Sequence, residues 1–206
     1  MADNKIVVFD VGGVFFDFKP CFQKVSDDSG LGFETVKDIW IKLDDQICQG
    51  KISTDVFINE INQKAPKKLK IDDFTSYWTE AFVPDHQIIN LALSLSKTTN
   101  IGMLTNIFPG IFDKSVESGK IPYITNCRLL ESHKYGLTKP NPQIFLKYSE
   151  IFGFKPNEIL LIDDTLINIT EANNQGWNTH HLDKNINDYT TRLTNRINSF
   201  IQKNLP

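Results

Sequence analysis

Three short apolar runs along the chain share one pattern: each is an unbroken stretch of apolar side chains that ends in polar ones. They cover residues 5–10, 100–106 and 158–164. A strand buried on both faces by helices has this pattern, whereas a half-exposed strand alternates. The segments between the runs are long enough for helical crossovers. The pattern therefore predicts an α/β fold, with a parallel sheet as a core flanked by helices.

Apolar periodicity between these runs predicts the supporting elements. Helices are expected at about 86–98, 141–153 and 165–175, followed by an edge strand at 177–182 and a polar helix at about 186–203. Gly153 and Gly176 then fall at helix C-terminal ends, where a positive φ is needed.

The segment 19–84 has a helical period and few strand-like runs. Because the strand before it ends at Asp10 and sheet-building resumes only near residue 100, we expect a small helical cap over the carboxyl edge of the sheet. The predicted domains are a catalytic core of residues 1–18 and 85–206 and a cap of residues 19–84.

Composition excludes several function classes. With a net charge of -3 and a pI near 5.8, the 206-residue chain lacks the basic footprint of a nucleic-acid partner. No apolar stretch reaches the roughly 18 residues of a membrane span, and no apolar leader precedes the first strand, so we expect a cytoplasmic protein that is a monomer or a weak homo-oligomer. Three widely spaced cysteines, Cys21, Cys48 and Cys127, predict reduced thiols in or near the core rather than a disulfide framework or a zinc site.

Carboxylates at the ends of two predicted strands carry the first chemical signal. Asp10 precedes a glycine-rich turn, and Asp163 and Asp164 end another buried run. Taken singly, each could be a turn or helix cap. Carboxylates converging from separate strands repel unless a cation lies between them, and hard oxygen ligands favour Mg²⁺.

Two further elements add weaker signals. Thr105 and Asn106 end the middle run with a hydroxyl and an amide that could hold phosphate oxygens. Lys139 lies on a turn before a helix and could offset charge on a transferring phosphoryl group. Alone, an exposed lysine is usually only solvated.

Taken in order, these elements resemble the four motifs of the haloacid dehalogenase-like hydrolase superfamily, over nearly the whole chain. The matching segments are residues 8–14, 104–106, 132–142 and 161–168. The resemblance implies a Rossmann-like core with a cap inserted after the first motif. It also implies an aspartate nucleophile, an aspartyl-phosphate intermediate and Mg²⁺ as cofactor.

The same resemblance implies a role for each matching residue. Asp10 would be the nucleophile, Lys139 would neutralise charge, and Thr105 and Asn106 would bind the phosphoryl group. Mg²⁺ would be held by Asp10, the Gly12 carbonyl and Asp164, with Asp163 and Asn168 in support.

One position departs from most phosphatases of this superfamily, which carry a second aspartate two residues after the nucleophile as general acid and base. Here that position is Gly12. The chain resembles most closely a subgroup of bacterial α-D-glucose-1-phosphate phosphatases whose first motif also lacks this acid. The expected substrate is a small phosphorylated metabolite such as a sugar phosphate.

Two alternatives stay open. A haloacid dehalogenase would use the same aspartate without metal, and its fourth motif normally lacks the acidic pair. A non-catalytic binding protein would explain Gly12 but none of the intact motifs. The adjacent His180 and His181 point to opposite faces of a strand and predict no shared metal. Trp40, Trp78 and Phe82 could line a substrate pocket, but their spacing favours core packing, and no site role is assigned to them.

Overall fold

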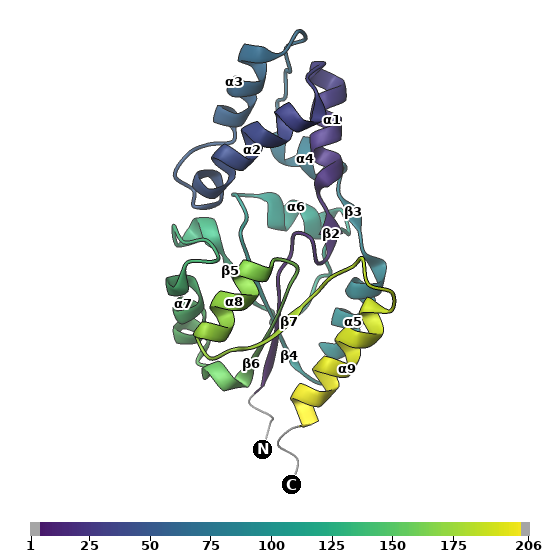
Figure 1. Cartoon of the computed structure of the whole chain (residues 1–206), viewed down its shortest axis with the longest axis vertical. Coiled ribbons are helices and arrows are strands. Elements are labelled where there is room, and N and C mark those ends of the chain that lie inside the picture. The colour runs from purple at the N-terminus through teal and green to yellow at the C-terminus, as the bar shows by residue number, and fades with distance from the viewer. Residues whose placement is uncertain (1–4, 203–206) are drawn as a thin grey trace.

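The computed structural model describes residues 5–202, and its centre is a parallel sheet of five strands in the order β5-β4-β1-β6-β7 (Figure 1). All neighbouring strands in it are parallel. The predicted parallel α/β core is therefore confirmed. The strands are β1 (Ile6–Phe9), β4 (Asn100–Thr105), β5 (Arg128–Glu131), β6 (Ile159–Asp163) and β7 (Asn178–His181).

Helices cover both faces of this sheet, which explains why the central strands are apolar without alternation. Val7 and Phe9 of β1 face the side covered by α5 and α9, while Ile6 and Val8 face α7 and α8 (Figure 1). The helices of the core are α5 (His86–Leu95), α6 (Ile111–Glu117), α7 (Pro142–Phe152), α8 (Leu166–Asn174) and α9 (Tyr189–Gln202).

The predicted helices are present with small shifts at their ends. The first stops at Leu95, and the last begins at Tyr189. Gly153 ends α7 with φ 73°, and Gly176 follows α8 with φ 80°, as expected of residues that leave a helix. The predicted helix end at 203 and the predicted core residues 1–4 and 203–206 lie outside the described residues.

Several short elements were absent from the sequence-based prediction. β5 has only two apolar residues between Arg128 and Glu131, too few to show a period, and α6 is a helix of two turns. Two short 3-10 helices, η1 (Ser132–Lys134) and η2 (Pro156–Glu158), were also missed. Segments this short owe their structure to their neighbours rather than to local sequence.

Four helices lie between β2 and β3, in the segment that separates the first two core strands, and we call them the insert helices. They lie beyond the carboxyl ends of the strands (Figure 1). A two-stranded antiparallel sheet forms their base, where β2 (Phe16–Asp17) pairs with β3 (Val83–Pro84). The insert helices are α1 (Lys19–Ser29), α2 (Phe33–Cys48), α3 (Asp55–Lys64) and α4 (Phe74–Glu80).

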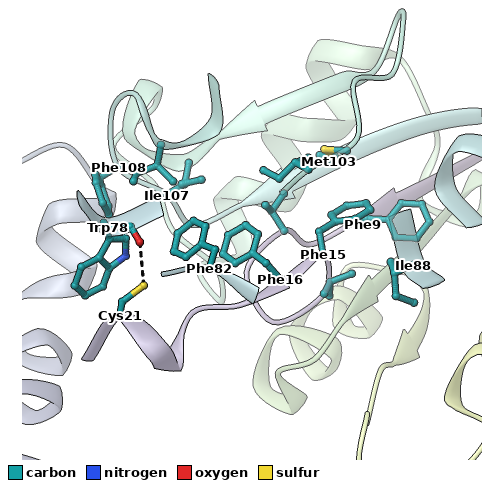
Figure 2. Packing of buried hydrophobic residues seen from close by; sticks show 14 of the residues in the cluster. Phe9, Phe15, Phe16, Cys21, Trp78, Phe82, Ile88, Met103, Ile107 and Phe108 are labelled. Carbon is teal, nitrogen blue, oxygen red and sulfur yellow. Dashed lines mark hydrogen bonds between the residues drawn. The ribbon is translucent and has the colours of Figure 1, made fainter. Parts of the chain in front are cut away.

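A continuous apolar cluster joins the sheet to the insert helices (Figure 2). Phe16 and Phe82 stack with ring centroids 3.9 Å apart at the base, and Trp40 stacks on Trp78 at 4.6 Å within the insert. Trp40, Trp78 and Phe82 are therefore core residues, as predicted. The three cysteines are free, and Cys21 and Cys48 are buried. Within residues 5–202, no helix combines the length and hydropathy needed to cross a bilayer.

Candidate active site

The candidate site lies where the strand order reverses. β1 lies between β4, the next core strand along the chain, and β6, which follows only after β5. Open parallel sheets bind their ligands at the carboxyl ends of strands at such a switch point. Asp10 follows β1 directly, Asp163 ends β6 and Asp164 comes next, so that oxygens of all three carboxylates lie within 4.8 Å of one another.

Lys139 is the cation at the centre of this group. Its Nζ lies 2.8 Å from Asp10 Oδ1 and 2.6 Å from Asp163 Oδ2, and its side chain is 1% exposed. The carboxylates of Asp10 and Asp163 outweigh the effect of burial and raise the pKa of Lys139, so the amine stays charged. Three carboxylates against one ammonium leave a net charge of −2, which one divalent cation would cancel.

The pKa of Asp10 is raised from 3.8 to about 8: burial is the largest cause, Lys139 acts in the opposite direction, and the carboxylates of Asp163 and Asp164 add to the rise. Burial, with Asp163 as the next cause, also raises the pKa of Asp164. The protein's own groups therefore do not neutralise the negative charge of these carboxylates. Oxygen ligands, converging geometry and excess negative charge all fit a hard divalent cation such as Mg²⁺.

Asp163 is held behind the site rather than facing the cavity. Its side chain is fully buried, Asn168 Nδ2 donates to both of its oxygens at 3.1 Å, and the Thr165 amide donates to Oδ1 at 2.9 Å. With Lys139 as a further donor, the carboxylate is fixed in one orientation. Asn168 thus meets the other site residues through Asp163, and the supporting role predicted for both stays a prediction.

The turn after β1 sets the position of the first carboxylate. The Val11 amide donates to Asp10 Oδ1 at 2.7 Å. Gly13 has φ 77°, and a Cβ on it would lie 2.1 Å from Asp164 Oδ2, so only glycine lets this carboxylate approach the turn. At Gly12, by contrast, the nearest neighbour of an added Cβ is the Phe18 ring at 3.7 Å, an ordinary contact.

Thr105 and Asn106 lie beside these groups at the end of β4. Within residues 5–202 the Thr105 hydroxyl has no hydrogen-bond partner, although the residue is 1% exposed and borders the cavity. Asn106 is differently placed: its Nδ2 donates to the Lys139 carbonyl and its Oδ1 accepts from the Lys139 amide, both at 2.8 Å. Its side chain thus holds the backbone of the central lysine.

A cavity of about 250 Å³ opens between the strand ends and the insert helices. Its floor contains the predicted site residues Asp10, Gly12, Thr105, Asn106, Lys139, Asp164 and Asn168, together with Thr165. Its walls are mostly apolar and aromatic, with one carboxylate and one thiol: Phe16, Phe18, Trp40, Asp44, Cys48, Trp78, Phe82, Ile107, Phe108 and Ile111. A polar, charged floor below mostly apolar walls fits a small organic molecule that has one charged end.

Several residues of the site were missed in the sequence. Trp40, Trp78 and Phe82 border the cavity although no site role was predicted for them, and Asp44 and Cys48 were not considered. The spacing of Trp40, Asp44 and Cys48, four residues apart on a helix, is the signal that could have found them. His181, for which no metal role was predicted, has Nε2 3.0 Å from the Asp164 carbonyl oxygen and so must donate to it.

Comparisons with known proteins show which phosphatase and which solved structures this chain resembles. No protein-family model matches the chain. It is 28% identical over 213 residues to a D-ribitol-5-phosphate phosphatase of Bacteroides thetaiotaomicron, covering 95% of this chain and 99% of that one. A crystal structure of a HAD family enzyme from the same organism, in complex with magnesium and inorganic phosphate, matches with a TM-score of 0.71 at 24% identity over 89% of this chain and 96% of that one.

The chain has the haloacid dehalogenase-like (HAD) fold. A predicted HAD-like family hydrolase from Porphyromonas gingivalis matches with a TM-score of 0.73 at 21% identity, over 94% of this chain and 97% of the other. An L-2-haloacid dehalogenase from Xanthobacter autotrophicus matches with a TM-score of 0.66 at 15% identity, over 97% and 87%. A dehalogenase and other HAD family proteins therefore share this fold, so the chemistry has to be argued from the site.

Proposed function

We propose that this protein is a Mg²⁺-dependent phosphatase that hydrolyses a small phosphorylated polyol or sugar through an aspartyl-phosphate intermediate. The observation that carries the proposal is the convergence of Asp10, Asp163 and Asp164 at the switch point, with Lys139 Nζ 2.8 Å from Asp10. The D-ribitol-5-phosphate phosphatase relative, whose alignment covers 95% of this chain, supports the same chemistry.

Asp10 is the nucleophile in this proposal. Lys139 and the Val11 amide both hold Oδ1, whereas Oδ2 has no hydrogen-bond partner within residues 5–202. A carboxylate oxygen attacks phosphorus, the bond from phosphorus to the leaving oxygen breaks, and the alcohol departs after taking a proton from water. A second water then attacks the aspartyl-phosphate, which releases inorganic phosphate and restores Asp10.

The metal would be held by Asp10, Asp164 and the Gly12 carbonyl, with Asp163 and Asn168 in support. When bound, it would supply positive charge that keeps Asp10 ionised and offsets charge on the phosphoryl group. Lys139 neutralises charge on Asp10 and on the phosphoryl oxygens. Thr105 donates its free hydroxyl to a phosphoryl oxygen. Asn106 was predicted to bind the phosphoryl group as well, and we assign that contact to its backbone, because its side chain holds Lys139.

The cavity favours a neutral, compact leaving group. It has room for a small metabolite, and residues 19–84 act in this proposal as the cap that closes over it. The relative's printed substrate, D-ribitol 5-phosphate, supports a phosphorylated polyol, and a sugar phosphate such as an anomeric glucose phosphate is the second candidate. Without an acid at Gly12, leaving groups that need little protonation should react fastest.

The test is metal-dependent release of phosphate. We expect hydrolysis of p-nitrophenyl phosphate and D-ribitol 5-phosphate that needs added Mg²⁺ and stops with EDTA. Asp10→Asn should lower kcat by about 10⁴-fold or more, because no nucleophile remains. Asp38→Asn is the matched control, since this exposed carboxylate lies on α2 away from the cavity.

The dehalogenase alternative is tested in the same assay with L-2-chloropropionate. Chloride release that is insensitive to EDTA, with no phosphate release from either ester, would replace the proposal. Turnover of phosphate esters by Asp10→Asn at the wild-type rate would show that another group attacks phosphorus. Absence of both activities in a folded wild-type protein would favour the binding-protein alternative.

A further inference from the structure

One face of α2 looks into the cavity. Trp40, Asp44 and Cys48 follow at intervals of four residues, which places them one above another on a helix, and all three border the cavity. The other cavity residues from the insert are Trp78 and Phe82. Asp44 is thus the only ionised side chain that residues 19–84 present to the cavity.

Contacts at the end of α2 fix this face relative to the catalytic groups. The Thr138 hydroxyl donates to Asp45 Oδ1 at 2.6 Å, and the Ser132 hydroxyl donates to the Cys48 carbonyl at 2.5 Å. Thr138 directly precedes Lys139. The helix that carries Asp44 is therefore tied to the loop that carries the central lysine.

Asp44 has no protein partner that would explain its place. Within residues 5–202, no Lys, Arg or His nitrogen forms an ion pair with it, and no side chain donates a hydrogen bond to it. Burial raises the pKa of this half-buried carboxyl. A carboxylate between a tryptophan and a cysteine in a largely apolar wall costs free energy unless a ligand binds it.

Asp44, Cys48 and Asp10 all border the same cavity. Burial raises the pKa of the Cys48 thiol, and the carboxylates of Asp44, Asp45 and Asp10 add to that effect. A phosphate bound near Asp10 would therefore leave the rest of its molecule in a cavity of about 250 Å³ that Asp44 also lines.

We propose that Asp44 is the specificity-determining residue that accepts hydrogen bonds from hydroxyl groups of the leaving group and so selects phosphorylated polyols. This inference rests on the proposed phosphatase function. A carboxylate accepts two or more hydroxyl donors, while the apolar walls contact the carbon chain. The same charge repels a second anionic group on the substrate.

A substrate with an ammonium group is the alternative ligand for Asp44, because aromatic rings beside a carboxylate can bind a cation. Stacking covers one face of each of four rings in these walls, because Trp40 stacks on Trp78 and Phe16 on Phe82, with interplanar angles of 24° and 9°. Fewer ring faces are therefore left to surround a cation. Hydroxyl recognition is therefore the better match to these walls.

The experiment compares Asp44→Asn with wild type on substrates that differ only beyond the phosphate. With D-ribitol 5-phosphate, we expect kcat/KM to fall about 10- to 100-fold, mostly through KM, because hydrogen bonds to a charged acceptor are lost. With n-pentyl phosphate and p-nitrophenyl phosphate, which have no hydroxyl groups, kcat/KM should change less than about threefold. A phosphorylated sugar acid should become a better substrate by several-fold, because the repulsion is gone.

Asp38→Asn removes an equal charge from the same helix and should leave all four substrates unaffected. The gain on the sugar acid cannot come from misfolding, and Asp44→Ala repeats the test if Asp44→Asn is unstable. Equal losses on all substrates, or a preference of the wild type for phosphoethanolamine that Asp44→Asn abolishes, would overturn the inference while leaving the phosphatase proposal intact. No phosphate release from any ester by wild type would overturn the phosphatase proposal itself, and the inference with it.

Discussion

Different interactions stabilise the strand-end site and the insert helices. At the strand ends, buried charges are fixed by directional contacts: Lys139 by two carboxylates, and Asp163 by Lys139, Asn168 and the Thr165 amide. In the insert, aromatic rings pack on one another, with Phe57 and Phe74 around Trp78 at 5.8 and 5.2 Å.

The difference determines what each region tolerates. A buried charge network depends on the identity of every member, because removing one partner leaves another uncompensated. An apolar cluster depends mainly on volume and shape, so similar residues can replace one another. Chemistry can therefore be preserved at the strand ends while the walls that select the substrate vary. Asp44 is the exception among the insert residues that line the cavity, because it is a carboxylate and its neighbours there are mostly aromatic.

Replacing Lys139 should have the largest combined effect on activity and stability, because it removes the cation of the strand-end site. Lys139→Met leaves Asp10 and Asp163 without a cation, and we expect kcat/KM to fall by about 10³-fold. Without Mg²⁺ the variant should also lose about 3–5 kcal/mol of unfolding free energy, and added Mg²⁺ should restore part of it. Steady-state kinetics and denaturant unfolding with and without Mg²⁺ measure both effects.

Lys147→Met is the matched control, because Lys147 forms only an exposed pair with Glu150 at 3.1 Å. Its variant should stay within about 0.5 kcal/mol of wild type. A Lys139→Met protein with wild-type stability in EDTA would show that the buried carboxylates need no compensating cation.

The two adjacent glycines offer a sharper test of the metal site. Gly13→Ala places a Cβ 2.1 Å from Asp164 Oδ2 at a positive φ, so the carboxylate must move. We expect the Mg²⁺ concentration for half-maximal activity to rise about 10- to 100-fold. Gly12→Ala, whose Cβ would contact only the Phe18 ring at 3.7 Å, should change it less than about threefold. Equal responses to Mg²⁺ in the two variants would exclude Asp164 as a ligand.

Sequence reasoning succeeded where chemistry depends on residue identity. Apolar runs ending in Asp10, Thr105 and Asp163 predicted three strands of the sheet and the convergence of their ends, because parallel strands bring their carboxyl ends to one edge. Lys139 was predicted only through the motif order, since nothing local distinguishes it from a solvated lysine. The structure adds that it is buried between two carboxylates.

What the sequence could not predict depends on contacts between distant segments. β5 is recognisable only through its pairing with β4, because Arg128–Glu131 is too short for a pattern. The use of the Asn106 side chain to hold Lys139 joins positions 33 residues apart. The four-residue spacing of Trp40, Asp44 and Cys48 predicts one face of a helix, but only the orientation of α2 over the strand ends shows that this face borders the cavity.

Changing a ring in the insert should have the smallest effect and leave the chemistry untouched. Phe57 is fully buried, contacts Trp40 at 5.1 Å and does not border the cavity. Phe57→Leu should lower the unfolding free energy by about 1–2 kcal/mol through lost contacts and a small void. Activity on p-nitrophenyl phosphate at 25 °C should stay within about twofold of wild type, because no group at the strand ends moves.

The value of this variant lies in its contrast with Lys139→Met, since Mg²⁺ should not restore the stability that Phe57→Leu loses. Unfolding curves of both variants with and without Mg²⁺, read beside their kinetics, separate the two regions. If Phe57→Leu abolished turnover while still folded, packing in the insert would reach the catalytic groups directly. The hydrogen bond from the Thr138 hydroxyl to Asp45 would be the first connection to test, because it joins α2 to the loop that carries Lys139.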